Sequence, residues 1–177
     1  MPYERDRDIS CVYSLPRLKR ELQNYAVRFS NYEGGTTIGA YLAHWAEVRE
    51  VEFVAMNAFA PAYEFSQLGI TLQAMRMDED WKSWLDLMRR IDYMMGLGLD
   101  LSDLEERSRE LTEAWTQKIN ELERERPDLH VKAYIEAMTK DFRERPFIPL
   151  DDAWNELGDL LGNMDDEDRD EDDRERE

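Results

Sequence analysis

The segment NYEGGTTIGAYLAHWAEV, Asn31–Val48, combines a glycine-rich turn, two threonines and a histidine, which are candidates for ligand binding or catalysis. Backbone amides of a glycine-rich turn that meets a helix N-terminus can hold an anion, and the two threonine hydroxyls would add hydrogen-bond donors. Because the glycines are adjacent and the phosphate-binding lysine is absent, neither G-x-x-x-x-G-K-[ST] nor G-x-G-x-x-G is present. The pattern therefore favours a tight turn followed by a threonine helix cap. The alternative is a ligand site formed by Glu33, Gly34, Gly35, Thr36, Thr37 and His44.

The histidines and the single cysteine give little support to catalysis or metal binding. His44 has Glu47 three residues later as a possible orienting carboxylate, but a packed or exposed histidine is the simpler interpretation. His130 lies far away and no H-E-x-x-H pattern occurs, which disfavours zinc. Cys11 is the only cysteine, which excludes an intramolecular disulfide, and its apolar surroundings favour a buried thiol over a nucleophile. The sequence therefore assigns no catalytic residue, no metal and no cofactor.

Carboxylates and tryptophans are abundant, and both have a structural interpretation. Acids in stretches such as DLEERSRELTEAW lie three and four residues from arginines, which indicates solvated ion pairs on a helix surface. The tryptophans occur at helical spacing and are typical of a helix core. The same aromatic helix faces are also candidates for protein contact, and the residues concerned are Trp81, Trp84, Trp115 and Trp154.

The charge of the chain restricts its partners. Of 177 residues 36% are charged, and the formal net charge is -18, which disfavours nucleic acid and anionic membranes because both bind through clustered Lys and Arg. No apolar run is long enough to span a bilayer, and the first dozen residues are too charged for a signal peptide, so we expect a cytoplasmic protein. The last thirteen residues, DDEDRDEDDRERE, contain ten acids and three arginines and predict a disordered tail.

Apolar periodicity predicts an α/β region followed by helices. Strands are expected at Ile9–Tyr13 and within Val51–Pro61, with two helices and a loop, RFSNYEGG, between them. The second of these helices, near Thr37 to Arg49, has an apolar face composed of Ile38, Tyr41, Leu42, Trp45 and Val48. From Met77 onward the pattern is helical only. Asp78 is a candidate N-cap for the first of these helices, which the glycines of GLGLD should end. Ser102 and Glu105 form an S-x-x-E pattern that predicts a capping box for the next helix, which Pro127 should break. We therefore expect residues 1–76 to form part of an α/β domain, 77–162 a helical extension packed on it, and 163–177 the acidic tail.

This arrangement has too few strands. Two strands joined through helices are expected to be parallel, and so small a parallel sheet is not stable in water. Either another chain supplies strands, or the chain is the C-terminal part of a larger α/β domain. Both explanations predict an exposed apolar sheet edge and an exposed apolar helix face.

The order of motifs resembles the proteasome assembly chaperone family, in its broad prokaryotic sense, from about Ser10 to Leu161. Tyr32, Gly34 and Thr36 are similar to its Y-x-G-P-T turn, and VEFVAMNAFAPAY is similar to its apolar strand and following loop. MMGLGLDLSDLEE and RPFIPLDDAWNELGDLL resemble later segments of bacterial members. Gly35 replaces the usual proline, the first strands of the family domain are missing, and RERE replaces the tail by which some partners dock on proteasomes.

The resemblance implies a nonenzymatic protein-binding or assembly-chaperone-like module. Its partners would be another protein or further copies of the same chain, and a homo-oligomer is expected. The alternative is a small-molecule-binding protein or a hydrolase- or ligase-type enzyme on a related α/β fold, with its site near Glu33–Thr37. Fold analogy alone is weak support for an activity.

Overall fold

A computed structural model describes residues 1–31, 36–65, 75–77 and 79–149. The chain divides into two compact units, Met1–Pro146 and Phe147–Glu177. The second unit is described only for residues 147–149, so Trp154 and the expected acidic tail lie outside the described residues, as do Glu33, Gly34 and Gly35. The helices and strands of the described residues all lie in the first unit.

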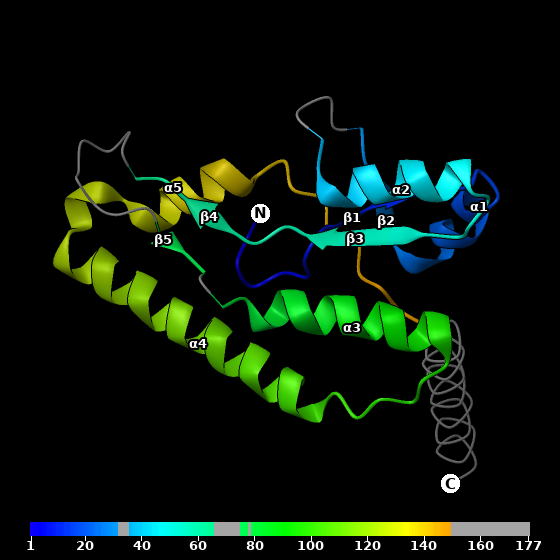
Figure 1. Cartoon of the computed structure of the whole chain (residues 1–177). Helices are drawn as coiled ribbons and strands as arrows, with labels where there is room; N and C mark the ends of the chain where they lie inside the picture. The colour runs from blue at the N-terminus through cyan, green and yellow to red at the C-terminus, as the bar shows by residue number, and fades with distance from the viewer. Residues whose placement is uncertain (32–35, 66–74, 78, 150–177) are drawn as a thin grey trace, which may run out of the picture. The chain divides into compact units, whose positions relative to one another are not determined.

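The fold is α/β, with a small mixed sheet in the order β2-β1-β3 (Figure 1). Strand β1 (Ile9–Tyr13) pairs in parallel with β2 (Val27–Phe29) and antiparallel with β3 (Val54–Ala58). The prediction that β1 and β3 are parallel was therefore wrong, because apolar patterning reports burial and not strand direction. Strand β2 was assigned to a loop, since three residues are too few to show an alternating pattern.

The side chains that point to the two faces of the sheet differ in size. Ile9 and Cys11 are fully buried on the face covered by α1 (Leu18–Leu22), where Leu87 from helix α3 (Trp81–Met95) also packs. A 3-10 turn, η1 (Gln23–Tyr25), follows α1, and the left-handed Ala26 (φ 49°) leads from it into β2. Side chains alternate along a strand, so Val12 and its cross-strand partner Ala55 point to the opposite face.

Helices occupy the rest of the unit. Besides α3 they are α2 (Ile38–Val48), α4 (Ser102–Glu125) and α5 (Val131–Thr139). A 3-10 turn, η3 (Pro127–Leu129), follows α4. Strands β4 (Ala62–Tyr63) and β5 (Met75–Arg76) form a separate short antiparallel ladder. Helices α2 and α3 both contact β3, and Figure 1 shows them on opposite sides of the sheet. A second core joins α4, α5 and the N-terminal segment; it contains Tyr3, Tyr63, Phe65, Trp115, Ile119, Leu129, Val131 and Ile135.

Capping residues explain where the helices begin and end, and part of this capping is predictable from the sequence. Asp80, not Asp78, caps α3 by accepting a hydrogen bond from the Ser83 amide at 3.3 Å; Asp78 lies outside the described residues. The left-handed Gly96 (φ 59°) ends α3, as glycines after a helix do. The S-x-x-E pattern starting at Ser102 does not act as a capping box, because the N-cap of α4 is Leu101 and no side chain makes the cap hydrogen bond. Asp100 accepts from the Ser102 amide at 3.0 Å.

Candidate interaction surface

Helix α2 packs on the sheet through its small residues. Ala43 is buried, and Gly39 lies so close to the sheet that an added Cβ would be 3.0 Å from the Ala55 Cβ and 3.7 Å from Val12 Cγ2. Ala40 and Ala46 are half-buried beside them. Small side chains on both surfaces allow the helix backbone to approach the sheet closely. The inward face of α2 therefore contributes little apolar volume to the core.

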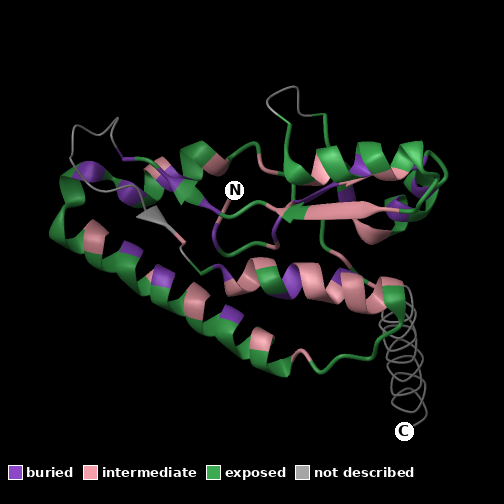
Figure 2. Cartoon of the chain, in the orientation of Figure 1, coloured by how far each residue is buried: buried purple, intermediate pink, exposed green. Residues whose placement is uncertain are grey.

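The large apolar residues of α2 all point away from the sheet. Figure 2 shows α2 as mostly exposed around its outward surface. The exposed fractions are Ile38 80%, Tyr41 53%, Leu42 44%, Trp45 41% and Val48 60%. The predicted exposed apolar helix face is thus confirmed. An apolar patch formed by five large side chains is at the upper end of what monomers expose and is often a contact surface.

Aromatic and cationic contacts hold the centre of this face in place. The rings of Tyr41 and Trp45 meet edge to face, with centroids 6.2 Å apart, and the Arg49 guanidinium lies 4.9 Å from the Trp45 ring. Arg49 Nη1 also donates to the Trp45 carbonyl at 3.3 Å. A tryptophan restrained from two sides loses less conformational entropy on binding, which suits it as an anchor.

The glycine–threonine segment is described only from Thr36 onward. Thr37 is the N-cap of α2, and its Oγ1 accepts a hydrogen bond from the Ala40 amide at 3.2 Å. This is the structural role predicted for one of the threonines. Thr36 is exposed, and His44 is exposed beside Trp45, with ring centroids 6.1 Å apart. The described part of the segment thus brings no nucleophile and base together.

The outer edge of β3 is a second contact candidate. In the described residues β3 is a terminal strand of its sheet, as the predicted apolar edge requires. A groove of about 490 Å³ runs beside it, where Phe53, Val54 and Met56 face residues of α3. The groove is lined by Leu18, Glu21, Glu52, Phe53, Val54, Met56, Leu87, Ile91, Met94 and Met95. Sheet edges of this kind accept an added strand from another chain.

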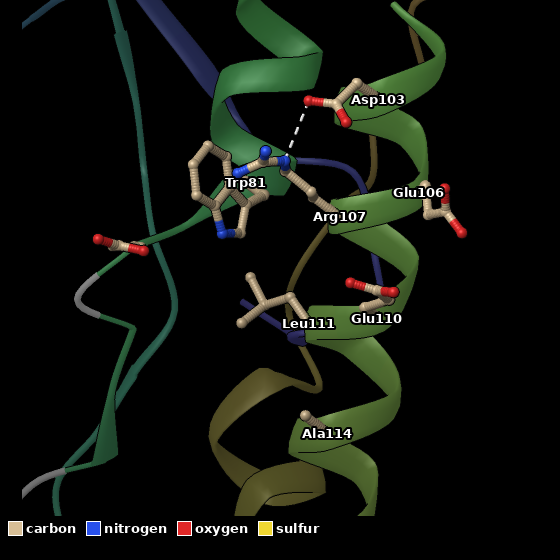
Figure 3. Close-up of a pocket in the computed structure, with 8 residues that line it drawn as sticks. Trp81, Asp103, Glu106, Arg107, Glu110, Leu111 and Ala114 are labelled. Atoms are coloured by element: carbon tan, nitrogen blue, oxygen red, sulfur yellow. Dashed lines mark hydrogen bonds and ion pairs between the residues drawn. The ribbon is translucent and has the colours of Figure 1, made fainter.

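The four candidate tryptophans lie in different environments. Trp81 is half-buried under the Arg107 guanidinium, 4.7 Å from its ring, in an open acidic hollow of about 620 Å³ on α4 (Figure 3). Arg107 is in turn bound to Asp103 at 3.0 Å, so this hollow is a solvated ion-pair surface. Trp84 is 58% exposed on α3, whereas Trp115 is 7% exposed in the core and offers no contact surface in the folded chain. Trp154 lies outside the described residues.

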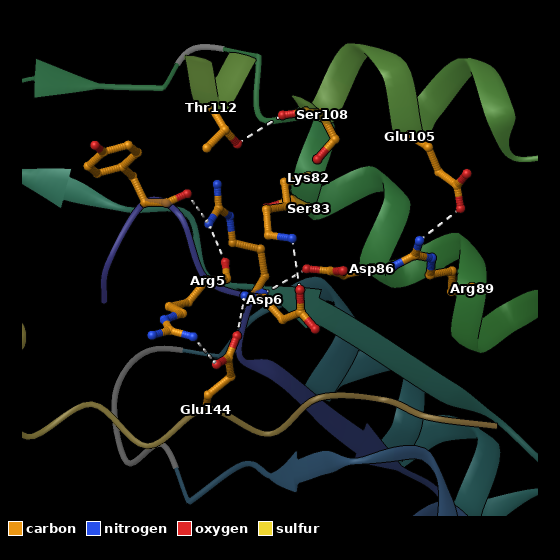
Figure 4. Close-up of polar contacts among 12 residues, drawn as sticks. Arg5, Asp6, Lys82, Ser83, Asp86, Arg89, Glu105, Ser108, Thr112 and Glu144 are labelled. Atoms are coloured by element: carbon orange, nitrogen blue, oxygen red, sulfur yellow. Dashed lines mark hydrogen bonds and ion pairs between the residues drawn. The ribbon is translucent and has the colours of Figure 1, made fainter. Parts of the chain in front are cut away.

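A buried ionic cluster connects the N-terminal segment to α3, and sequence analysis did not find it. The Arg7 guanidinium donates to the Asp80 carboxylate from Nε at 2.7 Å and from Nη2 at 3.0 Å. The backbone amide of Arg7 donates to the Asp86 carboxylate at 2.7 Å. Arg90 donates to the backbone carbonyls of Asp86 and Tyr25. Figure 4 shows the partly exposed rim of the cluster, where Lys82 approaches Asp6 and Arg5 approaches Glu144.

The cluster has a structural role: it joins the N-terminal segment to α3, and its central residues are buried from solvent. These residues are Arg7, Asp80, Asp86 and Arg90. Burial raises the pKa of Asp86. Burial also opposes ionisation of Asp80, but hydrogen bonds from Arg7 and Ser83 outweigh it and hold the pKa of Asp80 below its usual value. Only tertiary structure brings Arg7 to Asp80, so no spacing rule could have revealed the pair.

Other reactive groups give no active site within the described residues. Cys11 is buried, as predicted, and burial raises the pKa of its thiol to about 11, which keeps it protonated and inert at neutral pH. In the part of the chain described, no three His, Cys, Asp or Glu side chains gather to hold a metal ion. None of the described helices is long and apolar enough to cross a membrane. Comparisons with protein-family models, curated proteins and solved structures give no match.

Proposed function

We propose that the chain is a nonenzymatic protein-binding module that acts in the assembly of other proteins, the role implied by its resemblance to the proteasome assembly chaperone family. The supporting observation is the outward face of α2, where five large apolar side chains are exposed on one 11-residue helix. Interface centres are depleted in charge and enriched in aromatic residues. In α2 Glu47 is the one acidic residue, although 36% of the chain is charged.

The enzymatic alternative near Glu33–Thr37 has less support. The hydroxyl of Thr37 is engaged as a helix cap, and His44 projects into solvent beside an aromatic side chain. Among the residues that the structure describes, neither group has the partner that general acid–base or nucleophilic chemistry needs. The proposed protein partners and a cytoplasmic location remain consistent with the acidic, charged composition.

The proposal is tested by using the purified full chain as bait in an extract of cells that make it. We expect specific partners to be retained by the wild type and lost by Trp45→Glu, which places a carboxylate at the centre of the face. The matched control is Trp84→Glu, the same change at a more exposed tryptophan on α3. Far-ultraviolet circular dichroism should be the same for all three proteins, because neither tryptophan is buried.

The pattern of partners that each variant retains shows whether binding depends on α2. Partners that Trp45→Glu loses and Trp84→Glu retains would support the α2 face as the binding surface. Retention by both variants, or loss by Trp84→Glu alone, would refute the assignment to α2. Quantitative mass spectrometry of the three eluates is the measurement.

A further inference from the structure

The outward residues of α2 follow the spacing of a coiled-coil seam. Ile38, Tyr41, Trp45 and Val48 are separated by three, four and three residues, which are the a and d positions of a heptad. Leu42 and His44 then occupy the flanking e and g positions. Gly39, Ala40, Ala43 and Ala46 fall at b, c and f, and these are the small residues turned toward the sheet. The exposed surface is therefore shaped to receive one further helix.

We propose that this helix is α2 of a second copy of the chain, packed antiparallel across a two-fold axis; this inference rests on the proposed protein-binding function. The spacing of the seam is the same when read in reverse. Antiparallel pairing about residue 43 places Ile38 of one copy opposite Val48 of the other, and Tyr41 opposite Trp45. Aliphatic residues then meet at both ends of the contact and aromatic residues meet at its centre. A two-fold contact requires such self-complementarity.

The distribution of charge makes this self-contact possible in a chain of net charge -18. The a, d, e and g positions of α2 contain no acidic residue, and Glu47 lies at position c, away from the seam. Among the described residues, the acids nearest in sequence to the seam lie at the C-terminal end of the helix and are Glu47, Glu50 and Glu52. A parallel pair would bring these acids together, whereas an antiparallel pair puts them at opposite ends. Antiparallel helix dipoles favour the same arrangement.

The exposed area is sufficient for a reversible dimer. With about 200 Å² for a large apolar side chain, the exposed fractions of the five residues correspond to roughly 550 Å² per copy. Two copies would bury about 1,100 Å², near the lower limit of a specific interface. We therefore expect a concentration-dependent equilibrium between monomer and dimer, with hydrophobic contacts that persist at high salt because the seam has no ion pairs.

Sedimentation velocity on the full chain at increasing concentration tests the occupant of the face. The wild type and Trp84→Glu should both reach the dimer, at 0.15 M and also at 0.5 M NaCl, because salt does not weaken an apolar seam. Trp45→Glu should weaken association about a hundredfold or more, because a carboxylate is placed opposite Tyr41 in the seam. A wild type that stays monomeric, or a Trp45→Glu variant that still forms the dimer, would overturn the proposal. If the wild type stays monomeric but α2-dependent capture of another protein persists, only the second-copy inference fails.

Cysteine cross-linking tests the antiparallel orientation. Two differently tagged chains, Ile38→Cys and Val48→Cys, should form a mixed disulfide when oxidised together, while neither should link to itself. Ten helical residues span about 15 Å, whereas a disulfide needs Cα atoms within about 7 Å. Cys11 does not interfere because it is fully buried. Self-linked Ile38→Cys dimers would instead show a parallel pair and overturn the antiparallel arrangement.

Discussion

Replacing Arg7 with methionine should lower the free energy of unfolding by about 3 to 5 kcal/mol, the usual cost of removing one member of a buried ion pair. The Arg7 side chain is fully buried and donates two hydrogen bonds to Asp80. It also donates to the carbonyls of Tyr3 at 3.0 Å and Arg5 at 2.8 Å. Methionine fills much of the space of the arginine stem but removes the Arg7 donors, so Asp80 keeps only its hydrogen bonds from Ser83. For a chain of this size the loss corresponds to a fall in Tm of roughly 6 to 20 °C.

The pH dependence identifies the cause of the loss. In the wild type the pKa of Asp80 is lowered, so the pair stabilises the fold above the unfolded pKa of that carboxyl and the contribution is lost as the pH falls through its folded pKa. Without Arg7 only the hydrogen bonds from Ser83 oppose the effect of burial, so the pKa of Asp80 should rise. Protonation then relieves the buried charge, so the deficit of Arg7→Met should shrink between pH 7.5 and pH 5.0.

Urea unfolding followed by tryptophan fluorescence at both pH values is the assay. The matched control is Arg17→Met, whose partner Glu52 forms an ion pair with both side chains more than half exposed. An exposed pair contributes at most about 1 kcal/mol. Equal losses for the two variants at pH 7.5, or a deficit of Arg7→Met that does not change with pH, would refute the buried-charge explanation.

Three further measurements, two on substituted chains and one on the wild type, test other elements of the fold. Thr37→Ala should cost about 1 kcal/mol in urea unfolding, because the Ala40 amide loses its acceptor, and Thr37→Ser should restore most of it. Trp115→Ala should cost about 3 to 5 kcal/mol by the same assay, since the side chain is buried against Tyr3 and Tyr63, and a loss below 1 kcal/mol would contradict its place in the core. The native Cys11 thiol should resist Ellman's reagent at pH 8 and react fully in urea, because it is buried with a pKa of about 11; rapid labelling of the native protein would disprove this.

Local chemistry made part of the fold predictable. The α/β character, the glycine end of α3, the break at Pro127 and the burial of Cys11 each depend on a short stretch of sequence. Strand direction and the β2 strand did not follow from the sequence, because pairing partners are set by tertiary contacts. The Arg7–Asp80 pair joins residues 73 positions apart, and no local pattern distinguishes them from the other charged residues of a chain that is rich in acidic and basic side chains.

The candidate surface was predictable in composition but not in orientation. Periodicity placed the large apolar residues of α2 on one face, and the shortage of strands predicted that some helix face would be exposed. Which side meets the sheet depends on the sheet itself. Gly39 and Ala43 match the small Val12 and Ala55 surface, and larger side chains would hold the helix away from it.

Because of this orientation, the residues of α2 that are proposed to bind a partner differ from the residues that pack on the sheet. Ile38, Tyr41 and Val48 are more than half exposed in the folded unit, so they contribute little to its stability. Large apolar side chains there increase the risk of aggregation unless another surface covers them. Polar substitutions on this face should therefore reduce association while leaving the unfolding free energy nearly unchanged, whereas substitutions of Gly39 or Ala43 should do the reverse by disturbing the contact with the sheet.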